Sequence, residues 1–328
     1  MAREWAILRT MSTRWCLAFT VASVLGMSGC AATPAARLEY GTHQTILPGL
    51  DACDDRGTDP VELDPLRPVV VLVHGCNSSS GMFLRMAEVF RQRGQQVICF
   101  SYGYRRRIKQ SAHRLRRALS GLATEVASPQ ITVIGHSQGG LVARAALQSD
   151  EVTPPLPETV GIRLVTISSP FNGIAISKHC GMWPAHVFSL GIVTAICQGV
   201  AGSAWVDIHP QAAYVKHPHP LGPWVASHLV VRTNESGSCL ESRTDGRCSK
   251  SDTVFSLVEQ TNPALIADPR TRTLTLKAGH SAVVGHAGAP PSLLLRTLEH
   301  EGILRGSGPE DEAFLETVYR PTLAALSD

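Results

Sequence analysis

The sequence predicts an α/β fold in which helices cover both faces of a mostly parallel sheet. Two observations lead to this prediction: short, continuous apolar segments recur along the chain, and amphipathic helical segments separate them. Unbroken apolar strands are typical of parallel sheets, because such strands are buried on both faces. With 328 residues, the chain is long enough to bury a large core of this kind.

The expected strands are short apolar runs, most of them rich in β-branched residues. They are residues 69–73, 97–102, 131–134, 162–168, 229–233 and 274–276. Helices are expected where apolar residues recur at helical spacing between these strands. They are residues 82–93, 111–127 and 141–149. Residues 174–228 break the alternation with a segment rich in Gly, His, Trp and Pro, which we interpret as an insertion over the sheet.

The beginning of the chain has the pattern of an export signal. Basic residues precede an apolar run over residues 15–27, and small residues and Cys30 follow it. The run is too short to span a bilayer as a helix, which takes about 20 apolar residues. We therefore expect a signal peptide over residues 1–29, with Met11 as an alternative start.

The sequence MSGC at residues 27–30 resembles the lipobox of bacterial lipoproteins, in which the cysteine is acylated and becomes the mature N-terminus. The resemblance implies a lipid anchor on Cys30. The stretch that follows contains Ala, Thr and Pro, which is typical of a tether, so we expect a lipidated N-terminus and tether over residues 30–48 and a folded domain over residues 49–328. Ala31 follows the cysteine where an Asp retains some lipoproteins at the inner membrane, so we expect the outer membrane or the periplasm. An ordinary cleaved signal with an incidental cysteine is the alternative.

The charge of the chain excludes an electrostatic surface for nucleic acid. The formal net charge is +3, and residues 1–29 contribute three Arg and one Glu, so their removal leaves about +1. A chain this close to neutrality does not have the basic excess that binds phosphate backbones. We expect no nucleic-acid partner.

The cysteines of an exported chain favour disulfides over a metal site, because the sequence contains no C-x-x-C pair. Cys239 and Cys248 flank a short polar loop and are the first candidate pair. Two further pairs are proposed, Cys180 with Cys197 and Cys53 with Cys76, and Cys99 is expected to be a buried free thiol.

The most informative motif is GHSQG at residues 135–139, a G-x-S-x-G sequence. It directly follows one expected strand and precedes an expected helix, which is the setting of a nucleophile elbow. Such a turn is strained, and its small residues let strand and helix pass closely while the serine hydroxyl stays exposed. Ser137 is therefore the predicted nucleophile, and a tight turn with an idle serine is the alternative.

A serine hydroxyl becomes a nucleophile when a base takes its proton and an acid orients that base. In this architecture the acid and then the histidine follow the serine along the chain. We predict Asp252 as the acid, with Glu235 and Asp245 as rivals. We predict His280 as the base, because it lies in a Gly-containing loop after the last expected strand, with His286 as its rival.

The reaction also needs backbone N–H groups that face the developing oxyanion. We expect one from Gln138, directly after the nucleophile, and the other from Cys76, in the loop that follows strand 69–73. An ordinary turn at the strand end is the alternative for this loop. His74 and His136 lie within the motifs themselves, and structural roles are expected for both.

Four segments of the chain resemble the α/β-hydrolase superfamily, and within it the bacterial triacylglycerol lipases and esterases. They are VVLVHG at residues 70–75, GHSQGG at 135–140, ISSPFNG at 167–173 and GHSAVV at 279–284. The last segment is similar to the loop that carries the catalytic histidine in this branch, which supports His280 over His286. The resemblance extends over roughly residues 66–300.

The resemblance implies an α/β-hydrolase fold and hydrolysis of a carboxylic ester through an acyl-enzyme. Ser137 would attack, His280 would transfer the proton, and Asp252 would orient His280. It also implies that residues 174–228 form a lid or cap over an acyl-ester or lipid substrate. Two other functions stay open: an envelope acyltransferase or thioesterase, and a non-catalytic envelope binding protein on a hydrolase scaffold.

No cofactor and no metal is expected. Histidines are frequent in the insertion, but their spacings match no zinc signature. They are His179, His186, His209, His217, His219 and His228. The expected partners are the acyl substrate and, through the lipid on Cys30, the membrane.

Overall fold

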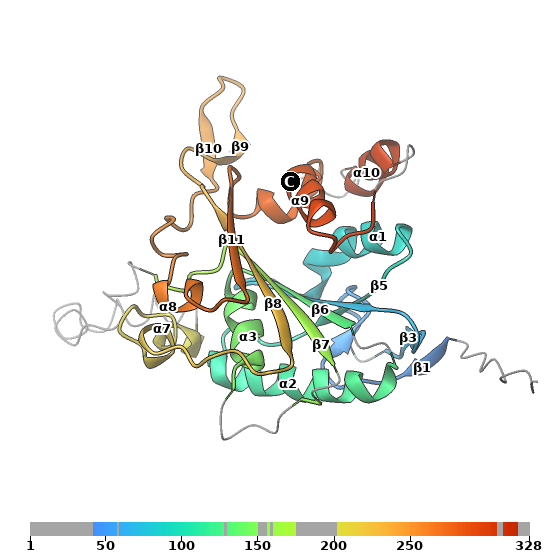
Figure 1. The fold of residues 1–328 in the computed structure, drawn as a ribbon. Helices are drawn as coiled ribbons and strands as arrows, with labels where there is room; N and C mark the ends of the chain where they lie inside the picture. The colour runs from blue at the N-terminus through green and yellow to red at the C-terminus, as the bar shows by residue number, and fades with distance from the viewer. Residues whose placement is uncertain are drawn as a thin grey trace, which may run out of the picture. The chain divides into compact units, whose positions relative to one another are not determined.

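A seven-stranded, mostly parallel sheet organises the protein in this computed structural model (Figure 1). The structure describes residues 42–57, 59–127, 130–149, 156–157, 160–174, 202–306 and 311–320. The strand order is β11-β8-β7-β6-β4-β5-β2, and of these seven strands β2 alone runs antiparallel to its neighbour. The predicted fold class is confirmed.

The six expected strands are present, β4 with the expected bounds and the other five with at least one end shifted. They are β4 (Val69–Val73), β5 (Gln96–Phe100), β6 (Gln130–His136), β7 (Gly161–Ile167), β8 (Val225–Thr233) and β11 (Thr271–Leu276). Five shorter strands were not predicted. They are β1 (His43–Thr45), β2 (Leu50–Asp51), β3 (Val61–Leu63), β9 (Cys239–Ser242) and β10 (Cys248–Ser251). Strand β2 extends the sheet beyond β5, whereas β1 pairs with β3 and β9 pairs with β10 in two separate antiparallel ribbons.

The three expected helices correspond to α1 (Leu84–Gln92), α2 (Ile108–Glu125) and α3 (Gln138–Leu147). The other helices among the described residues were not predicted. They are α7 (Ala213–Lys216), α8 (Pro263–Ile266), α9 (Ser292–His300), α10 (Asp311–Tyr319) and the 3-10 turns η1 (Ser80–Phe83), η2 (Gly202–Val206) and η3 (Ala282–Val284).

The apolar strands are buried because helices cover both faces of the sheet. In β4, Val69, Val71 and Val73 belong to one core cluster, whereas Val70 and Leu72 belong to the other. This alternation follows from the two-residue period of a strand. Helices α2 and α3 contribute to the first cluster, and α1 and α9 contribute to the second, from the opposite side of the sheet (Figure 1).

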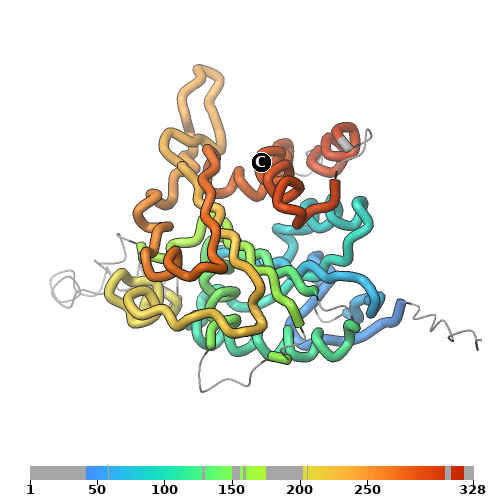
Figure 2. The backbone as a smooth tube through the Cα atoms, viewed as in Figure 1, coloured from blue at the N-terminus to red at the C-terminus, as the bar shows by residue number. Residues whose placement is uncertain are grey.

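The carboxyl ends of four neighbouring parallel strands lie at one edge of the sheet. Ser137 follows β6, Ser168 follows β7, Glu235 lies two residues after β8, and His280 lies four residues after β11. Figure 2 shows that the chain leaves this edge after β8, forms the β9–β10 hairpin and returns to it. A hydrogen bond from the Asp252 N–H to the carbonyl oxygen of Ser238, at 3.0 Å, joins the two ends of this excursion.

Two disulfides are present in the described part of the chain. Cys239–Cys248 closes the β9–β10 hairpin and confirms the first predicted pair. The predicted pair of Cys53 with Cys76 is wrong, because Cys53 bonds Cys99. The expectation that Cys99 is a free thiol is wrong for the same reason. Strand β2 pairs antiparallel with β5, and this pairing, which the sequence analysis missed, brings Cys53 to within 4.9 Å of Cys99 between Cα atoms.

Several sequence predictions fall outside the described residues. They concern the signal peptide over residues 1–29, the lipidated Cys30, the pair Cys180–Cys197 and residues 175–201 of the expected insertion. The described remainder of the insertion contains η2 and α7 before β8 begins. Within the described residues, no helix combines the length and apolar character needed to cross a membrane.

Candidate active site

Ser137 occupies a sharp turn between β6 and α3. Its backbone has φ 56° and ψ −125°, a conformation that is costly for a residue other than glycine. The neighbouring glycines allow strand and helix to approach, since a Cβ atom on Gly135 would lie 2.6 Å from the carbonyl oxygen of Gly139. The Ser137 N–H donates to the Ile167 carbonyl oxygen at 2.8 Å. This is the strand–turn–helix geometry expected of a nucleophile elbow.

His280 lies directly opposite this serine. Its Nε2 atom is 3.1 Å from the Oγ atom of Ser137, within hydrogen-bond distance. The backbone of His280 is fixed on both sides: its N–H donates to the Asp252 carbonyl oxygen at 2.9 Å, and its own carbonyl oxygen lies 2.9 Å from Nε2 of His136. The ring of Phe255 packs edge-on against the His280 ring at 4.8 Å between centroids. These contacts leave the imidazole little freedom to turn.

His136 is a buried neutral support for the base. A carbonyl oxygen can only accept a hydrogen bond, so Nε2 of His136 carries the proton that bonds to His280. Burial, and secondarily the nearby His280, lowers the pKa of His136 to about 3. Its structural role agrees with the expectation from the sequence.

Glu235 is the carboxylate that contacts the imidazole of His280. Its Oε1 atom lies 3.0 Å from Nδ1 of His280, and its side chain is fully buried. The other oxygen, Oε2, accepts hydrogen bonds from the backbone N–H groups of Val254 and Phe255 at 2.6 and 2.7 Å. Burial alone would raise the pKa of Glu235, but hydrogen bonds from His280, Ser168 and the Phe255 N–H together lower it to about 2. The carboxylate is therefore ionised across the physiological range of pH.

The prediction that Asp252 orients His280 is corrected by this geometry. The Asp252 carboxylate accepts hydrogen bonds from the backbone N–H groups of Ser281 and Ala282, at 2.9 to 3.1 Å, where η3 begins. It therefore fixes the loop that carries His280, and the side chain that faces the imidazole is that of Glu235, which the sequence analysis named as a rival. Asp252 acts on the base only through the backbone.

The other rivals lie away from this cluster. Asp245 accepts a hydrogen bond from the Arg247 N–H at 3.0 Å, in the exposed tip of the β9–β10 hairpin. Nδ1 of His286 lies 3.0 Å from the carbonyl oxygen of Ala287. The structure thus brings together Ser137, His280 and Glu235.

A second serine touches the acid and the base. The hydroxyl of Ser168 lies 2.6 Å from Oε1 of Glu235 and 2.9 Å from Nδ1 of His280. Ser168 is fully buried, with none of its surface exposed, and it lies on the Nδ1 side of the imidazole. From the sequence, Ser168 lies in a family-like segment and was given no role, and only its position at the end of an expected strand pointed to the site.

The expected oxyanion loop lies next to the nucleophile. A Cβ atom on Gly75 would lie 3.1 Å from Cβ of Ser137, so the Gly75–Cys76 turn after β4 packs against the elbow. The amide side chain of Gln138 donates to the Tyr104 carbonyl oxygen at 2.7 Å, which fixes the first turn of α3. Burial raises the pKa of the Cys76 thiol, so this sulfur is protonated and is not a competing nucleophile.

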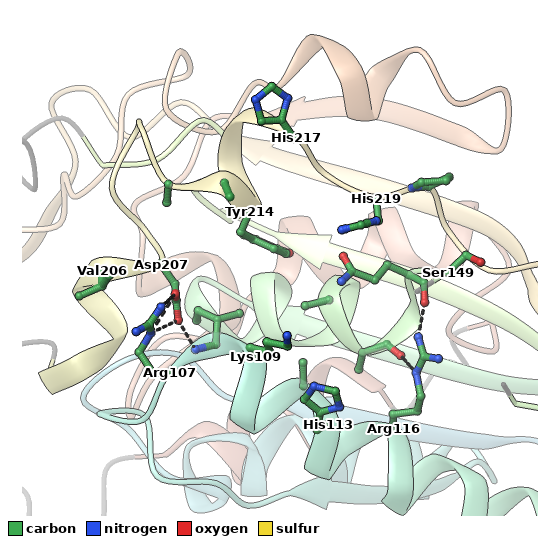
Figure 3. A pocket seen from close by; sticks show the side chains of 18 residues that line it. Arg107, Lys109, His113, Arg116, Ser149, Val206, Asp207, Tyr214, His217 and His219 are labelled. Atoms are coloured by element: carbon green, nitrogen blue, oxygen red, sulfur yellow. Dashed lines mark hydrogen bonds and ion pairs between the residues drawn. The ribbon is translucent and has the colours of Figure 1, made fainter. Parts of the chain in front are cut away.

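A cavity of about 940 Å³ opens elsewhere on the protein, along α2 and the end of α3 (Figure 3). Segments from η2 and α7 form its other side, and Arg107 pairs there with Asp207 at 2.6 Å. Among the described residues that line it, neither Ser137 nor His280 occurs. This cavity is therefore a feature separate from the serine–histidine–glutamate cluster.

The histidines of the insertion do not converge in the described structure. Nε2 of His228 bonds to the Thr166 hydroxyl at 2.9 Å within the sheet, whereas His217 and His219 line the cavity shown in Figure 3. In the described ranges, no group of three His, Cys, Asp or Glu side chains has a metal-binding arrangement. His179 and His186 lie outside those ranges.

Comparison with known proteins supports a hydrolase relationship. Residues 68–228 match the family model described as palmitoyl protein thioesterase. This match begins just before β4 and includes the Ser137 elbow, whereas Glu235 and His280 lie beyond it. No curated protein sequence matches the chain.

Solved structures with a similar fold include a lipase from Bacillus licheniformis, BlEst2. Its mature form is 16% identical, with a TM-score of 0.51 over 74% of this chain and 95% of that one. Its propeptide form is 15% identical, with a TM-score of 0.50 over 75% of this chain and 52% of that one. At this identity the likeness shows the fold alone. The protein thus has an α/β-hydrolase fold, and residues 68–228 of it are similar to the palmitoyl protein thioesterase family.

Proposed function

We propose that the protein is a serine hydrolase that cleaves acyl esters through an acyl-enzyme, with Ser137 as nucleophile, His280 as base and Glu235 as acid. One observation supports this most directly: the His280 imidazole joins the Ser137 hydroxyl at Nε2 to the Glu235 carboxylate at Nδ1. This is the arrangement by which a base activates a serine. Glutamate takes the place of the expected aspartate.

In the first half of the proposed reaction, Nε2 of His280 takes the hydroxyl proton while Oγ of Ser137 bonds to the acyl carbon. The carbonyl oxygen becomes an oxyanion, which the backbone N–H groups of Gln138 and Cys76 would stabilise. The intermediate then collapses, the bond to the leaving alcohol breaks, and the alcohol takes the proton from Nε2. The acyl group stays on Ser137.

In the second half, water attacks the acyl-enzyme. Nε2 of His280 takes a proton from the water as its oxygen bonds to the acyl carbon, and it returns that proton to Oγ of Ser137 when the acyl–serine bond breaks. The products are a carboxylic acid and the free enzyme. Throughout, the ionised Glu235 stabilises the positive charge on the imidazole and keeps the proton on Nδ1.

A thioester substrate is the second candidate, and the family match over residues 68–228 favours it. The same steps apply, with a thiol as leaving group. We expect hydrolysis of both a palmitoyl oxyester and a palmitoyl thioester with the same acyl chain. A kcat/KM for the thioester at least tenfold above that for the oxyester would assign the protein to thioester hydrolysis, and the reverse ratio would assign it to esters. If the protein hydrolysed neither the oxyester nor the thioester, the proposal would be contradicted.

The two alternatives from the sequence differ from this proposal in separate ways. An acyltransferase would pass the acyl group to an acceptor other than water, with the same three residues. A binding protein on a hydrolase scaffold would need none of the contacts at His280. The complete set of contacts supports a catalytic protein over a binding protein, because nothing in binding alone requires them.

We also propose that the protein is exported and anchored by a lipid on Cys30. The sequence at residues 27–30 supports the anchor, and the disulfides Cys53–Cys99 and Cys239–Cys248 accord with an oxidising compartment. Metabolic labelling with palmitate is expected to mark the full chain in a bacterial host and to be lost in Cys30→Ser. Labelling that persists in this variant would refute the anchor.

A further inference from the structure

Three buried polar side chains surround the acid on the side away from the nucleophile. They belong to Ser168, Thr233 and Gln260, and each is at most 1% exposed. Gln260 binds the backbone of Thr233 twice: its Oε1 accepts from the Thr233 N–H at 2.8 Å, and its Nε2 donates to the Thr233 carbonyl oxygen at 2.9 Å. These bonds fix the end of β8, two residues before Glu235.

The hydroxyls of this cluster converge on one carboxylate oxygen. Oε1 of Glu235 lies 2.6 Å from Oγ of Ser168 and 2.8 Å from Oγ1 of Thr233, in addition to Nδ1 of His280 at 3.0 Å. Oγ1 of Thr233 also lies 2.7 Å from Oγ of Ser168. Buried hydroxyls placed this closely around a charge form a network in which each bond fixes the others.

The protons of this network can be assigned from the donors available. An ionised carboxylate only accepts, so the Ser168 hydroxyl donates to Oε1 of Glu235. Oγ of Ser168 is then an acceptor toward Nδ1 of His280 at 2.9 Å, and Nδ1–H is shared between Ser168 and Glu235. Both acceptors require the proton to be on Nδ1. In the neutral imidazole with this tautomer, Nε2 is the acceptor, and it faces the hydroxyl of Ser137.

The backbone of Ser168 is held in a conformation that favours glycine. Its φ is 47°, in the left-handed region, and its N–H donates to the Val231 carbonyl oxygen at 2.8 Å. A buried serine in such a conformation costs conformational energy that a glycine would avoid. The side chain offsets this cost through its contacts with Glu235 and His280.

We propose that Ser168 is a positioning residue that fixes the tautomer and the orientation of His280 through Nδ1 and through Glu235. This inference rests on the proposed function, because it assigns a role within the same reaction. Ser168 is not itself the nucleophile: its hydroxyl proton is bound to Glu235, it lies on the Nδ1 side of the ring, and no part of it is exposed to a substrate.

The test compares three alanine or glycine variants of neighbouring serines. Ser168→Ala and Ser168→Gly are expected to lower kcat for a nitrophenyl ester about 10- to 100-fold, with KM within about twofold. We take this range from the loss seen when the partners that orient metal-binding histidines are removed. Ser168→Gly accepts the positive φ without strain, so it separates loss of the hydroxyl from loss of the fold. Ser169→Ala is the matched control, since Oγ of this buried neighbour bonds to the Ile167 carbonyl oxygen instead.

A proton NMR spectrum adds a readout that a merely structural role would not change. The Nδ1 proton of His280 is expected at low field in the wild type and in Ser169→Ala, and shifted or broadened in both Ser168 variants. The role of Ser168 as a positioning residue would be overturned if the Ser168→Gly variant kept the wild-type melting temperature, the wild-type kcat and the low-field signal of His280. An inactive wild type would instead overturn the proposed function, which keeps the two failures distinct.

Discussion

Replacing Ser137 with alanine is expected to lower kcat for ester hydrolysis by at least about 10⁴-fold, the scale seen when a serine nucleophile of a triad is removed. The reason is that Oγ of Ser137 is the hydroxyl 3.1 Å from Nε2 of His280, so its loss removes the atom that forms the acyl-enzyme. The measurement is the steady-state hydrolysis of a nitrophenyl ester by the purified mature protein.

The control for this variant is Ser168→Gly, because both serines contact His280. Under our account Ser168→Gly keeps enough activity to measure, whereas Ser137→Ala does not. Thermal unfolding of both variants shows whether the fold is intact. Residual activity of Ser137→Ala within tenfold of the wild type would refute Ser137 as the nucleophile.

Replacing Glu235 with glutamine is expected to lower kcat about 10³- to 10⁴-fold, as neutralising the acid of a triad does. Glutamine is close in shape, but it carries no charge to stabilise the protonated imidazole, and its amide can present N–H groups toward Nδ1 of His280. Asp252→Asn is the matched variant, and less than a tenfold loss is expected, since an Asn oxygen can still accept from the Ser281 N–H.

The comparison of these two carboxylates decides the identity of the acid. Kinetics of both variants are measured on the same ester, with melting temperatures to show that each is folded. A large loss in Asp252→Asn together with near wild-type kcat in Glu235→Gln would contradict the structure and restore the assignment expected from the sequence.

The carboxylate that faces His280 could not be identified from the sequence alone. The approach of Ser137 to His280 was predictable, because the GHSQG turn and the loop at residues 279–284 each follow an apolar strand. Of the three candidates for the acid, Asp245 lies in the β9–β10 hairpin, whereas Glu235 lies before the hairpin and Asp252 after it. The hairpin returns the chain to its starting point, so both carboxylates lie near His280, and only side-chain geometry separates them.

One pattern in the sequence favours Glu235 over Asp252 as the carboxylate that faces His280. The disulfide Cys239–Cys248, which was predicted, marks the residues between Glu235 and Asp252 as an excursion from the sheet. Glu235 then lies two residues after the end of β8, close to the strand end at which this architecture is expected to place the acid. Combining these two expectations would have selected Glu235.

The inner parallel strands such as β4 and β5 were predictable because they are buried on both faces and are therefore almost continuously apolar. Strand β2 was not predictable, because it has two residues, Leu50 and Asp51, and shows no periodicity. The antiparallel pairing of β2 with β5 brings Cys53 close to Cys99, with which it forms a disulfide. Because the strand was not predicted, this cysteine pair was not predicted either. Ser168 was likewise beyond prediction, since its role depends on tertiary contacts with Glu235 and His280.

The most direct test of the catalytic account is to find which residue reacts with a fluorophosphonate probe. The folded mature protein is treated with the probe, digested, and mapped by mass spectrometry. We predict one adduct, on Ser137, that is absent from Ser137→Ala and greatly slowed in Glu235→Gln. An adduct on Ser168, or no adduct on folded protein, would contradict the account.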